Sequence, residues 1–130
     1  MRLFLSLLLA GILITLGCGG HTIPMDPCTV VGLNIIPASA TANHAAAAPA
    51  NAASFGASAK FAGVCGAGTA IPPIANWSVS DPSVHISLTQ GSSTTATCTA
   101  ALAGPVTVTG TNATPVNGQT FTGTATLTCN

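Results

Sequence analysis

The chain has 130 residues, enough for one domain of ordinary size, and 48% of them are hydrophobic. Only 3% are charged, and the formal net charge is zero. So few charges exclude a nucleic-acid-binding protein, because the neutralisation of phosphates requires clustered Lys or Arg. They also argue against carboxylate chemistry, since Asp26 and Asp81 are the only acidic residues.

The first residues have the pattern of a secretory signal peptide. Arg2 is followed by an apolar run from Leu3 to Leu16. A helix of this length is too short to cross a hydrocarbon core of about 30 Å, as is usual for the apolar part of a signal peptide. The run therefore explains part of the mean hydropathy of +0.63, and we expect a secreted mature chain.

A lipidation motif follows the apolar run. The segment Ile14–Cys18 reads ITLGC and resembles the lipobox of bacterial lipoproteins, although Thr15 stands where that family usually has Leu. The resemblance implies that residues 1–17 are a cleaved signal peptide and that Cys18 carries palmitate-type acyl chains. The alternative is an ordinary secretory signal with an unmodified Cys18.

Residues 18–27 would then be the lipidated Cys and a short tether. Pro24 and Pro27 keep this segment extended, so that it reaches roughly 30 Å. Several acyl chains on one residue hold a protein firmly to a bilayer. Gly19, rather than Asp, follows the Cys, which by resemblance to lipoproteins of diderm bacteria favours the outer membrane. We expect a protein of the bacterial cell envelope.

From residue 29 onward, polar and apolar residues alternate with a period of two, which is typical of β-strands. The pattern is clearest in Thr120–Cys129, where Thr occupies every even position. Val106–Thr111 repeats it, and the loop between these two strands contains the turn dipeptide Asn117-Gly118. Further strands are indicated at Leu33–Pro37, Phe55–Phe61, Trp77–Val79, Val84–Leu88 and Thr94–Ala100.

Seven or so short strands with turn signals between them predict an all-β, antiparallel sandwich. The apolar side chains of each strand are expected to face the core, including those of Val84, Ile86 and Leu88. Ala45–Ala48 also fits a helix, but Pro49 and the flanking Asn residues favour a loop.

Three segments carry a resemblance to a known family. Leu33–Thr41 ends in PASAT, Trp77–Ser83 reads WSVSDPS, and Gly104–Thr111 reads GPVTVTGT. In this order and spacing they resemble the group 2 bacterial Ig-like domains found in intimin and invasin. The resemblance covers roughly residues 30–112 and implies an Ig-like sandwich, which we place at residues 28–130. An Ala-rich loop, four additional Cys and an extra Thr-rich strand depart from the family pattern.

The cysteines other than Cys18 form an even set, which in a secreted chain predicts two disulfides. Cys28 precedes the first strand and Cys65 follows the second, so that antiparallel strands place both at one end of the sandwich. Cys98 and Cys129 close the fifth and seventh strands at the opposite end. This geometry favours Cys28–Cys65 and Cys98–Cys129, whereas a Cys₄ zinc site would require closely spaced Cys pairs.

The amino-acid sequence contains no recognisable catalytic or metal-binding motif. His21, His44 and His85 are scattered, while a cupredoxin-type copper site needs a His shortly after a Cys. A serine triad needs a His–carboxylate pair to activate the nucleophile. Asp81 precedes Pro82, which is a usual position for opening a turn. We therefore expect no catalytic residue, no metal, no cofactor and no enzymatic activity.

Two functions remain open at this point. The first is a lipid-anchored, non-catalytic Ig-like module for adhesion, envelope structure or surface protein interaction. Its partners would be the membrane, through the N-terminal lipid, and an envelope protein or polysaccharide. The alternative is a small-ligand or glycan-binding module that uses Trp77 and the Ala/Pro-rich loops 42–53 and 66–75. Trp77 is the only Trp, and Ig-type sandwiches usually place such a residue in the core.

Overall fold

The structure is a computed structural model that describes residues 28–65 and 73–130. The expected signal peptide, Cys18 and the tether therefore lie outside the described residues. Within the described ranges no helix is long and apolar enough to cross a membrane. The strands are β1 (Thr29–Ile36), β2 (Ser39–Ala42), β3 (Ala52–Ala62), β4 (Ala75–Val79), β5 (Val84–Ile86), β6 (Gln90–Gly91), β7 (Ser93–Cys98), β8 (Val106–Asn112) and β9 (Thr122–Cys129).

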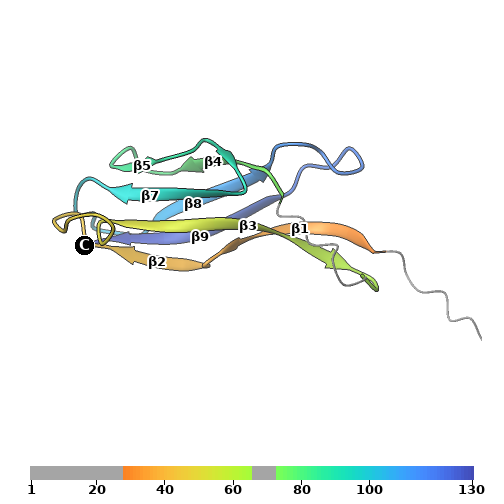
Figure 1. The fold of residues 1–130 in the computed structure, drawn as a ribbon, viewed down its shortest axis with the longest axis horizontal. Coiled ribbons are helices and arrows are strands. Elements are labelled where there is room, and N and C mark those ends of the chain that lie inside the picture. The colour runs from red at the N-terminus through yellow and green to blue at the C-terminus, as the bar shows by residue number, and fades with distance from the viewer. Residues whose placement is uncertain (1–27, 66–72) are drawn as a thin grey trace, which may run out of the picture.

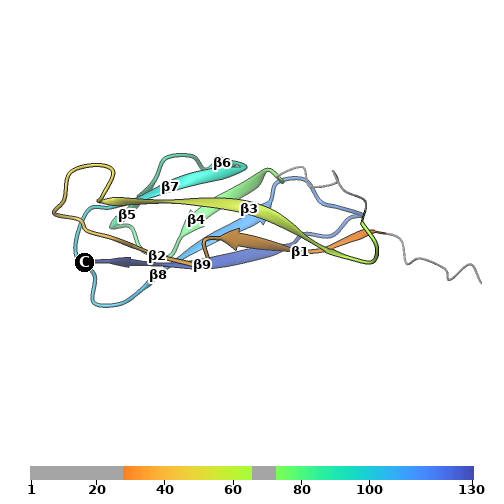
Figure 2. The same cartoon turned by 60° about the horizontal axis from the view of Figure 1, so that its bottom comes forward.

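The strands form two sheets that pack face to face (Figures 1 and 2). The four-stranded sheet has the order β1-β3-β7-β5, and the five-stranded sheet has the order β2-β9-β8-β4-β6. With β1, β3, β5 and β7 as strands A, B, D and E, and β4, β8 and β9 as C, F and G, this is the strand arrangement of immunoglobulin-type domains. The predicted all-β, Ig-like sandwich is confirmed.

One pairing corrects the expectation of a purely antiparallel fold. β1 pairs antiparallel with β3, but β2 pairs in parallel with β9. Between them, at Pro37 and Ala38, the chain leaves one sheet and joins the other without reversing its direction. β2 therefore keeps the direction of β1, which is also that of β9. The predicted first strand, Leu33–Pro37, coincides with the second half of β1, and a separate strand, β2, follows it in the other sheet.

The core consists of the inward-facing residues that the alternation predicts. In β9, Gly123, Ala125, Leu127 and Cys129 are buried, while the Thr residues between them are exposed. The largest side chain that is fully buried is that of Phe55, on β3. The expected loop at Ala45–Ala48 also forms, as a series of turns rather than a helix.

The apolar face of β5 is shorter than expected. Val84 is buried, but Leu88 is 53% exposed, so the prediction of an inward-facing Leu88 is wrong. The hydroxyl of Thr94, which is buried, donates a hydrogen bond to the Leu88 carbonyl and accepts one from its amide. Because a side chain binds the Leu88 backbone in this way, the strand ends at Ile86 and the Leu88 side chain faces solvent.

The turn predicted at Asn117-Gly118, between β8 and β9, is confirmed. Asn117 and Gly118 both have positive φ angles, 52° and 75°, as a two-residue hairpin turn requires. The flanking Val116 and Gln119 exchange backbone hydrogen bonds of 3.0 and 2.9 Å.

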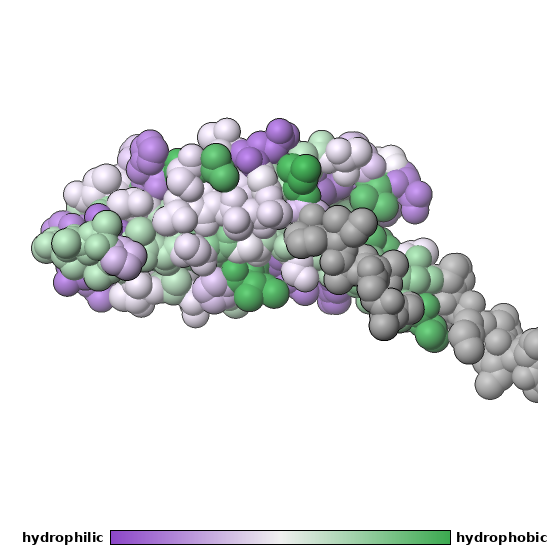
Figure 3. All heavy atoms as spheres, viewed as in Figure 1, coloured by the Kyte–Doolittle hydropathy of each residue, from purple (hydrophilic) through white to green (hydrophobic). Residues whose placement is uncertain are grey.

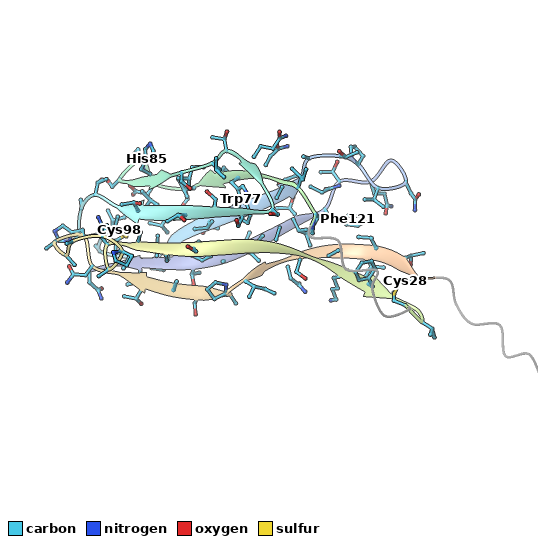
Figure 4. All side chains as sticks on the ribbon, in the orientation of Figure 1. Cys28, Trp77, His85, Cys98 and Phe121 are labelled. Carbon is cyan, nitrogen blue, oxygen red and sulfur yellow. A yellow bond between two sulfur atoms is a disulfide. The ribbon has the colours of Figure 1, made fainter. Side chains whose placement is uncertain are left out.

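The disulfides are Cys28–Cys65 and Cys98–Cys129, which confirms the predicted pairing. They lie at opposite ends of the long axis of the sandwich, as the positions of Cys28 and Cys98 in Figure 4 show. Cys28–Cys65 joins the start of β1 to the chain after β3, within one sheet. Cys98–Cys129 joins β7 to β9 and thereby links the two sheets.

Candidate functional site

Trp77 lies between the sheets and is not available as a sugar-stacking platform (Figure 4). Its side chain is 4% exposed, and its indole Nε1–H donates a 2.9 Å hydrogen bond to the carbonyl of Gly91. The aromatic ring is thus part of the core, and its one polar group is satisfied within the protein. The expectation of a core Trp is confirmed, and the alternative role of Trp77 as a binding residue does not fit its position.

The two loops of that alternative lie on opposite sides of β3 in the sequence. Loop 42–53 precedes β3 and contacts the C-terminal residue, where the amide of His44 donates to the Asn130 carbonyl. The segment 66–75 follows the other end of β3; of it the structure describes only residues 73–75. β3 has 11 residues and is therefore about 36 Å long. A pocket formed by both loops would involve residues 66–72, which lie outside the described residues.

The titratable side chains of the described residues do not form a site. No group of three or more His, Cys, Asp or Glu able to hold a metal occurs in residues 28–65 and 73–130. His44 Nδ1 lies 2.6 Å from the Asn130 carbonyl oxygen, while His85 is exposed on β5. Asp81 Oδ1 accepts a hydrogen bond from the Ser83 amide, which is the turn role expected from the sequence. His21 lies outside the described residues.

A cavity of about 380 Å³ opens between the sheets at the end that carries Cys28–Cys65. Its walls are mainly apolar side chains, among them Leu33, Phe61 and Phe121. The polar side chain of Asn112 also lines it, but its Nδ2 donates to the Thr114 carbonyl and its Oδ1 accepts from the Phe121 amide. As far as the described residues line it, the cavity therefore offers apolar contact surface and no reactive group.

The outer face of the five-stranded sheet carries a regular array of uncharged polar side chains, which we call the hydroxyl face. All its members point away from the core, in alternation with buried or half-buried residues. They are Ser39 and Thr41 of β2, Asn76 and Ser78 of β4, Gln90 of β6, Thr107, Thr109 and Thr111 of β8, and Thr122, Thr124, Thr126 and Thr128 of β9.

Strand register places these side chains in rows across the sheet. Thr107, Thr109 and Thr111 lie directly opposite Thr126, Thr124 and Thr122, respectively. The rows continue onto the neighbouring strands, because Ser39 pairs with Thr126, Ser78 with Thr109 and Asn76 with Thr111. Neighbours are therefore about 4.8 Å apart across the strands and about 6.8 Å apart along them. The sequence alternation predicts outward Thr residues but does not reveal these rows.

The two outer faces of the sandwich differ in chemistry. The four-stranded sheet presents Lys60 of β3, His85 of β5 and the exposed apolar side chain of Ile36. The hydroxyl face contains neither a titratable group nor a large apolar side chain. Figure 3 shows, for the side of the molecule in view, that strongly hydrophobic residues occur as separate groups on a surface of intermediate hydropathy.

Comparisons with known proteins give no match. No family model matches the chain, and neither a curated protein nor a solved structure does so. The resemblance to group 2 bacterial Ig-like domains thus remains a prediction from the sequence motifs, and the function has to be argued from the residues themselves.

Proposed function

We propose that this chain is a lipid-anchored, non-catalytic module of the bacterial cell envelope, related to group 2 bacterial Ig-like domains, that acts through contact with other envelope components. The observation that carries the proposal is the hydroxyl face. It is an outward-facing surface, exposed on β9 and half-buried on β8, whose side chains can form hydrogen bonds but lack the acid, base or nucleophile pairs of an active site.

The position at which β1 begins supports an anchored arrangement. β1 begins beside Cys28, directly after the proposed tether 18–27, and its first residue Thr29 pairs with Ala62 near the Cys65 end of β3. Loop 42–53 and Cys129 lie at the other end of the sandwich. A lipid on Cys18 would therefore hold one end of the long axis near the membrane and direct the other end away from it.

The covalent structure supports a location outside the cytoplasm. Both disulfides join residues of the described domain, and such bonds persist in secreted and cell-surface proteins but are rare in a reducing cytosol. A small core containing many Ala residues also benefits from this cross-linking, because each Ala buries little apolar surface.

Cys18→Ser is expected to abolish acylation of the protein in a diderm bacterium. The thioether and the new N-terminal amide of a lipoprotein both require this Cys. The measurement is metabolic labelling with an alkyne fatty acid, followed by detection on the purified chain. Thr15→Leu, which restores the usual lipobox residue, is the matched control and should remain labelled. A labelled Cys18→Ser protein, or an unlabelled wild type, would contradict the anchor.

A further inference from the structure

We propose that the hydroxyl face binds a neutral polysaccharide through multiple hydrogen bonds. This inference rests on the proposed function for its setting, the cell envelope, and names the class of partner. It places recognition on the flat side of the sandwich, away from Trp77 and from both loops.

The composition of the face argues against other classes of polymer. An anionic partner, such as a nucleic acid or an acidic glycan, is bound mainly by clustered Lys or Arg, and the face has neither. A cationic partner would need carboxylates, which are also absent from it. Protein interfaces concentrate their binding energy in buried Trp, Tyr and Arg side chains. The face instead consists of hydroxyl and amide groups, which match the uncharged hydroxyls of a neutral glycan.

The hydroxyls are held in place before a ligand arrives. Thr is branched at Cβ and has few χ1 rotamers, so that little side-chain entropy is lost on binding. Thr109 and Thr124 lie opposite each other on β8 and β9, the two strands next to the sheet centre. In the described part of the chain, neither of these hydroxyls makes a hydrogen bond, whereas Thr111 and Thr122 pair at 3.2 Å. Thr109 and Thr124 are therefore free to donate to a ligand and to accept from it.

The regular spacing favours a polymer over a single sugar. One hydroxyl–hydroxyl contact replaces contacts with water and stabilises a complex only weakly. A chain that repeats its hydroxyls can occupy several positions of the array at once, and the linked contacts then reinforce one another. The rows formed by Thr107 with Thr126, by Thr109 with Thr124 and by Thr111 with Thr122 provide such repeated positions.

The test is co-sedimentation of the full chain, purified in detergent, with amorphous cellulose and with granular starch. We expect the protein to bind at least one of these neutral polysaccharides, equally well at low and high salt. Thr109→Lys should weaken this binding by about tenfold or more, because it introduces an uncompensated ammonium group at the centre of the face. Thr124→Val, which keeps the shape but removes a hydroxyl, should weaken binding in the same direction.

Thr95→Lys is the matched control. Thr95 is half-buried, as Thr109 is, but it lies on β7, an inner strand of the four-stranded sheet, and points to the outer face of that sheet. It should bind like the wild type, and all three variants should retain the circular dichroism spectrum of the folded chain. Failure to bind either polysaccharide, equal loss in Thr95→Lys, or loss of binding at high salt would overturn the proposal. The purified protein needs no lipid anchor to sediment with a polysaccharide. Failure to bind would therefore overturn only the polysaccharide proposal, and the acylation of Cys18 is tested separately by fatty-acid labelling.

Discussion

Removing the Cys98–Cys129 disulfide by a double substitution to Ala is expected to lower the free energy of unfolding by about 2–5 kcal/mol. Cys98 is 2% exposed and Cys129 is 1% exposed, and the bond joins a strand of each sheet. The substitution releases a loop constraint in the unfolded chain. It also leaves a gap between the sheets where the sulfur atoms packed.

The Cys28–Cys65 disulfide provides the control for this prediction. The two bonds span similar sequence separations, 37 and 31 residues, so a purely entropic effect would make their removal equally costly. Cys28 and Cys65 are only half-buried, and they flank β1 and β3, which are already hydrogen-bonded to each other. We therefore expect the smaller loss for this pair. Urea unfolding of both double variants measures the two losses in free energy of unfolding. An equal loss, or a larger one for the Cys28–Cys65 pair, would contradict the inference that Cys98–Cys129 stabilises the packing of the two sheets.

Gly123→Ala is expected to lower the free energy of unfolding by about 1–3 kcal/mol or more. A Cβ atom at this position would lie 2.5 Å from the carbonyl oxygen of Leu33 and 3.2 Å from Ile35 Cγ1. The first of these atoms belongs to the backbone of β1, so a strand rather than a side chain would have to move. Ala would otherwise be favoured in a strand by roughly 0.5–1 kcal/mol, but the clash outweighs that gain.

Gly104→Ala separates the clash from the general effect of replacing a glycine. A Cβ at Gly104 would meet no heavy atom within 4 Å. This variant should leave stability unchanged or raise it slightly, because Ala restricts the unfolded chain. Urea unfolding of the two variants side by side is the measurement. Similar stabilities for Gly123→Ala and Gly104→Ala would show that β1 does not pack as closely against β9 as described.

Alternation of side chains made much of the fold predictable from the sequence. Each Thr between apolar residues in β9 marks an outward position, and the same pattern identifies β7 and β8. The disulfide pairing was also predictable. Cys28 and Cys65 flank two neighbouring strands of opposite direction, whereas Cys98 and Cys129 each end a strand, and these two strands run in the same direction.

Features that depend on tertiary contacts were not predictable in this way. The sheet switch after Ile36 depends on where β2 finds a partner, which no local pattern specifies. Leu88 faces solvent because the buried hydroxyl of Thr94 binds its backbone.

The candidate surface was predictable only in part. The sequence indicates that Thr107, Thr109 and Thr111 face outward, and the same holds for the Thr residues of β9. Which of them are neighbours depends on the register between β8 and β9, and this register is fixed by packing of the inner face. In this register Gly110 pairs with Gly123. Atoms of β1 lie so close to both glycines that a Cβ atom at either position would clash with them.

The proposed anchor is Cys18, which would hold this sandwich, with its few charged residues, at a membrane of the cell envelope. Mass spectrometry of the N-terminal peptide from the membrane fraction tests it most directly. We expect a mature chain that begins at Cys18 and carries acyl chains on the sulfur and on the amino group. A mature chain that begins at another residue, or one with a free thiol at Cys18, would contradict it.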